Sequence, residues 1–213
     1  MPDFVILLTI AGALAIGAIS PGPSFVLVSR VAVTASRPNG LAAALGMGVG
    51  GATFGMLALA GLSALLQQVE WLHLALKIGG GLYLVYLGIR IWRSATTPLV
   101  VDDMAEGRKR SAARSFWLGL VTQLSNPKTA IYYASIFAAL LPAKPAQGLL
   151  FALPPTIFLI EAGWYAIVAL AFSSSGPRAA YLRSKTWVDR VAGAVLGALG
   201  ARLLVDGLPS RAT

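Results

Sequence analysis

Three features bring polar chemistry into stretches of this chain that are otherwise apolar. Two are helix-breaking clusters, Ser20-Pro21-Gly22-Pro23 and Ser125-Asn126-Pro127-Lys128, and the third is the acid Glu161. Proline removes a backbone donor and disrupts the helical turn before it. In hydrocarbon, the freed backbone groups are tolerated only where protein buries them or a wet cavity reaches them. Both clusters are therefore candidate binding sites for a polar molecule.

The first cluster supplies mainly backbone groups and hydroxyls. Its candidate binding residues are Ser20, Pro21, Gly22, Pro23 and Ser24. A half-helix that begins at Pro23 would direct the positive end of its dipole at a carboxylate. A simple kink is the alternative, because Pro and Gly are common in membrane helices. Two prolines around one glycine exceed what a kink requires, which favours a binding role.

The second cluster adds an amide and a cation. Its candidate binding residues are Asn126, Pro127 and Lys128, with Tyr132 one turn later. A charge inside a membrane is costly and usually has a partner and a task. The alternative is that the Lys128 ammonium snorkels to the headgroups at the membrane surface.

Glu161 is the acid placed well inside an apolar stretch, too far from either end to reach water. Burial penalises its charged form, so we expect it to carry a proton or to bind a substrate ammonium. The alternative is a structural hydrogen bond or an ion pair, for which Lys128 is one candidate.

The composition places these residues in a membrane protein. The 213 residues are 57% hydrophobic and 12% charged, with a mean hydropathy of +0.75. Soluble domains are about 45–50% apolar and 25% charged. The net charge of +9 lies mostly in the gaps between apolar runs, which indicates topology and lipid headgroups rather than nucleic acid.

An all-α fold with six membrane spans is predicted, because six apolar segments are each near the roughly 20 residues that cross a bilayer. These segments are 4–33, 40–66, 71–92, 115–141, 146–173 and 187–204. The first is a retained span rather than a signal peptide, because its flank lacks Lys and Arg. The first and fourth segments contain the two proline clusters, so we expect both helices to be broken.

The distribution of Lys and Arg predicts the orientation. Basic residues gather after the first, third and fifth spans, while the alternate gaps hold few. By the positive-inside rule the rich gaps are cytoplasmic, so both termini would be periplasmic.

Two halves of three spans each would form an inverted repeat, the arrangement in which paired breaks mark a transporter's substrate site. The predicted units are a first repeat (1–93), a cytoplasmic linker (94–113) and a second repeat (114–213). Matching residues recur at a constant offset: Gly81, Gly88 and Arg90 in one half, Gly193, Gly200 and Arg202 in the other.

Other motifs favour structural roles. The run from Gly46 to Gly51 matches G-x-G-x-x-G but has no preceding strand, so it does not indicate a dinucleotide site. Gly51 and Gly55 are instead expected to let helices approach closely. With one histidine, His73, and no cysteine, we expect no metal, no cofactor and no enzyme activity.

These motifs together resemble the LysE/RhtB-type amino-acid exporters. The resemblance rests on Ser20-Pro21-Gly22-Pro23 with the following run to Arg30, on Leu87-Gly88-Ile89-Arg90, and on Asn126-Pro127-Lys128. It implies a multi-pass exporter of the bacterial inner membrane that uses the proton gradient to expel amino acids or similar metabolites. Family members often carry an aspartate where this chain has Glu161.

The sequence thus predicts a secondary transporter that exports a small amino acid in exchange for protons. Its partners would be the amino acid, protons and the lipid bilayer, and homo-oligomerisation is left open. A channel or facilitator with the same six spans is the alternative, and it would show no uphill transport.

Overall fold

The computed structural model describes residues 3–66, 70–98, 111–142 and 144–207, and these residues form eight helices and no strand. The helices are α1 (Asp3–Ile19), α2 (Pro23–Thr34), α3 (Arg37–Leu66), α4 (Glu70–Ser94), α5 (Ala112–Leu124), α6 (Pro127–Leu140), α7 (Gln147–Phe172) and α8 (Ser175–Gly207). The all-α prediction is therefore confirmed for the described residues. Most of the predicted linker, residues 99–110, lies outside them.

Most predicted spans coincide with one helix or with two consecutive helices. The pair α1 and α2 covers the segment predicted at 4–33, and the pair α5 and α6 covers 115–141. Prolines start the second helix of each pair, at Pro23 and Pro127, where the missing N–H group costs no intrahelical bond. The α1–α2 pair bends by 57° at its junction.

The last helix differs from its prediction, because α8 begins at Ser175, well before the segment predicted at 187–204. Two charged side chains near the start of the predicted segment are paired within the fold. Lys185 Nζ donates to Asp189 Oδ2 at 2.7 Å and to the Ala95 carbonyl beyond α4 at 3.2 Å. Thr186 Oγ1 donates to the same carbonyl at 3.2 Å. These contacts hold the basic first turns of α8 against the end of α4.

Length and apolarity identify membrane spans among the described helices. Residues Arg37–Gly61 of α3 and the whole of α7 each meet both criteria. The helices α1 and α2 meet them together, which gives up to three such spans. Pro154 and Pro155 do not interrupt α7, which continues to Phe172.

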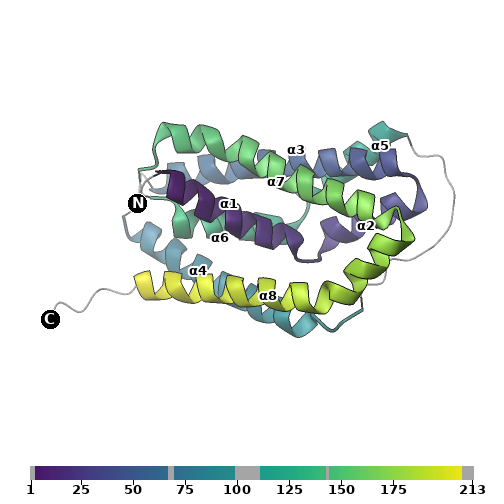
Figure 1. Cartoon of the computed structure of the whole chain (residues 1–213). Helices are drawn as coiled ribbons and strands as arrows, with labels where there is room; N and C mark the ends of the chain where they lie inside the picture. Colours follow the sequence, from purple (N-terminus) through teal and green to yellow (C-terminus); the bar gives the residue numbers. More distant parts are fainter. Residues whose placement is uncertain (1–2, 67–69, 99–110, 143, 208–213) are drawn as a thin grey trace.

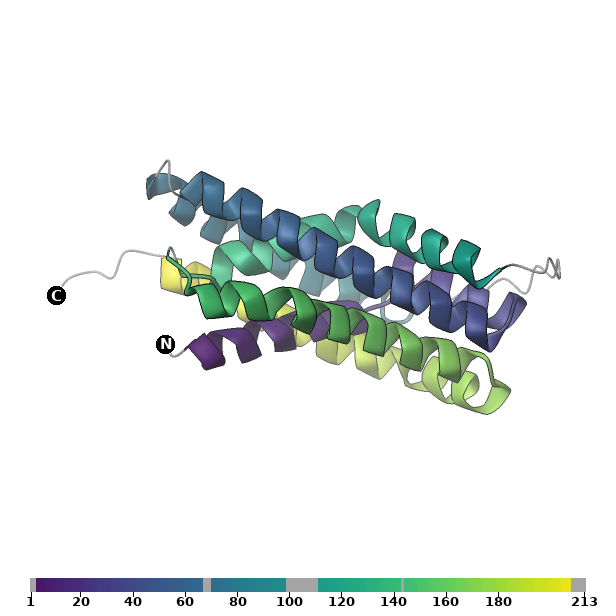
Figure 2. The same ribbon diagram turned by 90° about the horizontal axis from the view of Figure 1, so that it is seen from above.

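The helices form an elongated bundle (Figure 1). Helices α3 and α7 lie on one side, the pair α4 and α8 lies on the other, and α1 and α6 run between them. Seen from above, α3 packs along both α5 and α7 (Figure 2). The junctions of α1 with α2 and of α5 with α6 therefore lie in the interior of the bundle.

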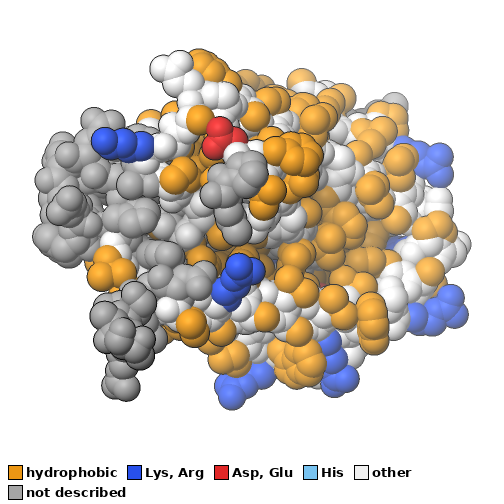
Figure 3. All heavy atoms as spheres, turned by 60° about the vertical axis from the view of Figure 1, so that its left-hand side comes forward, with side chains coloured by type: hydrophobic (Ala, Val, Ile, Leu, Met, Phe, Trp, Pro, Cys, Tyr) orange, Lys and Arg blue, Asp and Glu red, His pale blue; other side chains and the backbone are white. Residues whose placement is uncertain are grey.

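The outer surface of the bundle is apolar, as lipid contact requires. Phe151 is 79% exposed, and Leu159 on the same helix is 68% exposed. In Figure 3, hydrophobic side chains are spread over the whole described face, and the Lys and Arg side chains lie mainly toward its margins, with one near the middle. A soluble protein seldom exposes so many large apolar side chains together.

Glycines allow α4 and α8 to touch along their backbones. A Cβ atom added to Gly88 would lie 2.6 Å from the Gly193 carbonyl oxygen, and one added to Gly200 would lie 2.6 Å from the Gly81 carbonyl oxygen. The predicted packing role of Gly51 and Gly55 also fits, because a Cβ atom at either position would collide with a side chain of α7.

Candidate functional site

A chain of buried hydrogen bonds joins the α1–α2 junction to the α5–α6 junction. The Ser24 hydroxyl at the start of α2 donates to Gln123 Oε1 at 2.7 Å. Asn126 Nδ2 donates to Ser24 Oγ at 3.0 Å, and Asn126 Oδ1 accepts from the Lys128 backbone N–H at 3.0 Å. Asn126 therefore caps α6 and links the two junctions at the same time.

Lys128 directs its ammonium group at the end of α1. Its Nζ donates to the Ser20 carbonyl at 3.2 Å and to the Gly17 carbonyl at 3.5 Å. The last carbonyls of a helix lack intrahelical partners and carry the negative end of the helix dipole. The described geometry thus places the Lys128 cation on α1 rather than toward a membrane surface.

Glu161 lies in the middle of α7 and is 5% exposed. Its Oε1 accepts a hydrogen bond from the Tyr133 hydroxyl at 2.7 Å. Its Oε2 is buried without a hydrogen-bond partner in the described part of the chain. No described ion pair joins it to Lys128, whose donors go to α1 instead. One carboxylate oxygen is therefore available for a proton or a ligand.

Gly51 of α3 makes the space that Glu161 occupies. A Cβ atom at Gly51 would lie 2.9 Å from Glu161 Cγ and 3.3 Å from the Tyr133 hydroxyl oxygen. Gly17 does the same for Tyr132, whose hydroxyl donates to the Ala13 carbonyl. Small residues on two helices thus fit closely around the polar groups.

Two neighbouring cavities contain these groups. The inner chamber has a volume of about 20 Å³ and includes Glu161, Tyr133 and Tyr165 in its lining. A volume near 10–15 Å³ holds about one water molecule, so the chamber is nearly closed in this conformation. The second cavity, which we call the α4 cleft, measures about 460 Å³ and extends from the junctions to α4.

All ten predicted site residues line one or both cavities. Seven of them line the inner chamber: Ser20, Gly22, Ser24, Asn126, Lys128, Tyr132 and Glu161. Pro21, Pro23 and Pro127 line the α4 cleft. The structure therefore brings the predicted residues together around two neighbouring cavities.

Several residues at the site were not predicted. Gln123, which accepts the hydrogen bond from Ser24, was missed although it is a polar residue inside an apolar segment, a signal that the sequence does contain. Tyr165 lies one turn after Glu161, and its position in the sequence resembles ordinary core packing. Arg90 of α4, which lines the cleft, was used in the sequence for topology, for the internal repeat and for the family resemblance, but not as a binding residue.

The fold and the buried polar groups define a helical, multi-pass membrane protein. The chain belongs to the LysE type translocator family, whose family model matches residues 15–207. The resemblance seen in the sequence is thereby confirmed.

Named relatives cover nearly the whole chain. A threonine efflux protein of Escherichia coli (strain K12) is 32% identical over 203 residues, which is 95% of this chain and 98% of the relative. A threonine efflux protein of Salmonella typhi is 33% identical over 202 residues, or 93% and 97% of the two chains. An uncharacterized membrane protein of Haemophilus influenzae is 28% identical over 194 residues, or 90% and 92%. No solved structure is a significant match to this chain.

Proposed function

We propose that this protein is a secondary transporter of the bacterial inner membrane that exports a small amino acid in exchange for protons. Membership of the translocator family and the relatives named as threonine efflux proteins support the export of an amino acid. The observation that carries the proton role is the buried Glu161 carboxylate with its unpartnered Oε2 atom.

Competition at Glu161 would couple the two movements. A carboxylate inside a protein is stable when it is protonated or when it is paired with a cation. A proton and a substrate ammonium would therefore bind Glu161 in turn, and each would be carried across in the opposite direction. Antiport follows if the protein does not change conformation while Glu161 is charged and has neither a proton nor a substrate bound.

The substrate carboxylate would bind at the junctions. The helices α2 and α6 both begin there, at Pro23 and Pro127, and helix N-termini attract anions. Ser20, Asn126 and Lys128 would complete this part of the site from the shared wall of the two cavities. The substrate would then span from the junctions to Glu161.

The fold would consist of six spans in two inverted halves, with α1–α2 and α5–α6 each forming one broken span. The contacts between α4 and α8 support this symmetry. In the repeat, Gly81 corresponds to Gly193, and Gly88 corresponds to Gly200. The contact between Gly88 and Gly193 therefore corresponds to the contact between Gly200 and Gly81. A two-fold axis between the halves would produce such a reciprocal pair.

The test is transport by purified protein in proteoliposomes. We expect an imposed proton gradient to drive L-threonine, or another amino acid found in an efflux screen, against its own gradient. Glu161→Gln should abolish this uphill movement, because the amide takes up no proton. Glu161→Asp is the matched control, which keeps the carboxylate and should keep coupling. Uphill transport that persists in Glu161→Gln would contradict the proton role, and a wild-type protein that only equilibrates its substrate would be a facilitator.

A further inference from the structure

The α4 cleft lies beside the inner chamber and has the larger volume, about 460 Å³. Its walls come from α4 and from both junctions. Two cations line it, Arg90 and Lys128, and no Asp or Glu does. A cavity with two positive charges and no acid favours an anionic ligand.

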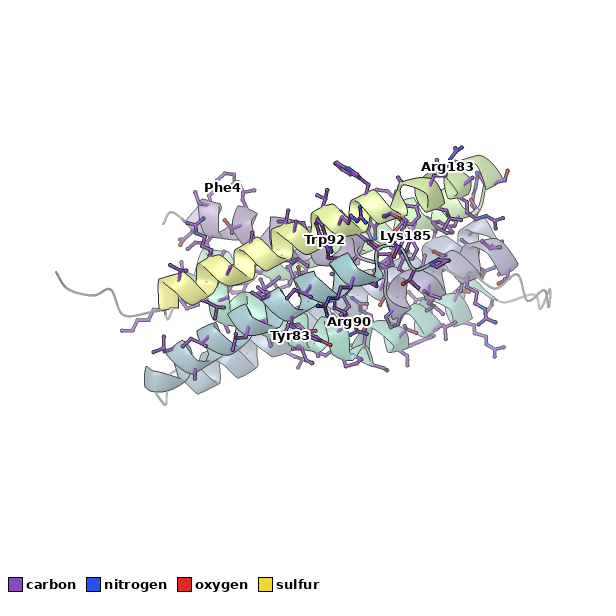
Figure 4. All side chains as sticks on the ribbon, turned by 90° about the horizontal axis from the view of Figure 1, so that it is seen from below. Phe4, Tyr83, Arg90, Trp92, Arg183 and Lys185 are labelled. Carbon is purple, nitrogen blue, oxygen red and sulfur yellow. The ribbon has the colours of Figure 1, made fainter. Side chains whose placement is uncertain are left out.

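Arg90 is the cation with unused donors. Among the described residues it makes no hydrogen bond or ion pair, and its neighbour in the cleft is the Tyr83 phenol, about two turns earlier on α4 (Figure 4). Two arginines elsewhere in the fold are engaged: Arg37 donates to the hydroxyls of Ser173 and Ser174, and Arg190 lies over the Trp92 ring. The guanidinium of Arg90 is thus positioned to take a carboxylate with two parallel hydrogen bonds.

Lys128 is the less available cation, because its ammonium is already hydrogen-bonded to two carbonyls of α1. It also separates the two cavities, together with Ser20, Gly22 and Asn126, which line both. The inner chamber is too small for an amino acid in this conformation. A substrate that approaches in this state therefore meets the cleft first.

We propose that the α4 cleft is an entry subsite in which Arg90 binds the substrate carboxylate before the inner chamber opens. This inference rests on the proposed function and adds to it a residue of α4 that contributes to substrate recognition. The Tyr83 phenol would lie beside the bound carboxylate, and Lys128 would be the group that the substrate has to pass.

The test measures whether the carboxylate is recognised through Arg90. Tritiated L-threonine is bound to the purified protein in dodecyl maltoside and displaced by L-threonine or by L-threoninamide, in which a neutral amide replaces the carboxylate. The wild type should prefer L-threonine. In Arg90→Gln the affinity for L-threonine should fall at least about tenfold, the scale of a lost charge-assisted hydrogen bond, with little change for the amide.

Two further variants separate recognition from general damage. Arg93→Gln removes a nearby exposed charge of α4 that does not line the cleft, and it should bind like the wild type. Arg90→Lys keeps the charge but loses the planar fork, so its preference should be intermediate. An equal loss for both ligands in Arg90→Gln would indicate a structural role and overturn the proposal.

Other outcomes identify other causes. If Arg90→Gln changes binding only after phosphatidylglycerol is added, Arg90 serves a lipid phosphate and the subsite is overturned. If the wild type binds L-threonine and Arg90→Gln keeps the same preference for L-threonine over L-threoninamide, the subsite proposal is overturned while the proposed function stands. If the wild type binds none of the standard amino acids when each is used as the radiolabelled ligand, both the proposed function and the subsite proposal are overturned.

Discussion

At the scale of single residues, the site depends on how little space surrounds Glu161. The Tyr133 hydroxyl donates to the carboxylate, and Gly51 has no side chain in the space beside the Glu161 stem and the Tyr133 hydroxyl. Gly51, Tyr133 and Glu161 come from three different helices, α3, α6 and α7. A small shift of one of these helices therefore moves the Glu161 carboxylate relative to Gly51 or Tyr133.

Gly51→Ala tests this fit. The added methyl would lie 2.9 Å from Glu161 Cγ, closer than side-chain carbons approach, so Glu161 or α3 must move. We expect transport to fall at least about tenfold, because displacement of a ligand group by about 1 Å costs up to a hundredfold in activity. Gly61→Ala on the same helix is the control, since a Cβ there meets nothing within 4 Å. Equal transport by both variants in proteoliposomes would contradict the role of this space.

Which residues meet at the site could be predicted only where the sequence carries an anomaly. Glu161 and Lys128 are charges in apolar runs, and the prolines interrupt predicted helices, so each stands out without a structure. Arg90 does not stand out, because an arginine near the end of a span is what topology alone requires. Its place beside Lys128 depends on the packing of α4 against the junctions, and no local pattern encodes that packing.

At the scale of helices, α4 and α8 approach each other closely along their backbones. Gly88 and Gly193 face each other there without side chains between them. Helices in membranes associate through such packing, because lipid gives no hydrophobic drive to bring them together.

Gly88→Ala should separate these helices and destabilise the protein. Its Cβ would meet the backbone of α8 at 2.6 Å and 2.7 Å, and backbone moves only with the whole helix. We expect a loss of about 1–3 kcal/mol, the usual cost of overpacking, and a lower melting temperature in detergent. Gly79→Ala, on the same helix with nothing within 4 Å, should melt within a degree or two of the wild type. An unchanged melting temperature for Gly88→Ala would show that the two helices separate at little cost.

The predicted helix boundaries agree with the structure where the length of an apolar run determines them. They disagree at the start of α8, where pairing of charged side chains determines the boundary. Five predicted segments match their helices closely, because hydrophobic runs ended by polar residues mark helix ends directly. The start of α8 was placed too late because Lys185 and Asp189 appear as surface charges in sequence. In the structure they pair with each other, and Lys185 also binds the end of α4, a contact distant in the chain.

At the scale of the whole molecule, orientation decides which way the exporter works. The described ends of α1 and α8 lie at one end of the bundle, together with the α6–α7 connection, and the α2–α3 connection lies at the other (Figure 1). Basic residues are concentrated after α2, after α4 and in the first turns of α8. The positive-inside rule predicts that the end that carries the termini is periplasmic.

Because the chain has no cysteine, single substitutions report this orientation directly. Thr97→Cys follows α4 and Lys144→Cys precedes α7, and both positions are exposed. In intact spheroplasts a membrane-impermeant maleimide should label Lys144→Cys but not Thr97→Cys. Thr97→Cys should be labelled only after the membrane has been permeabilised. Normal export by both variants would be the control for folding. The opposite labelling pattern would show that the orientation in the membrane is the reverse of the predicted one. The α4 cleft would then face the periplasm and could not receive a substrate from the cytoplasm.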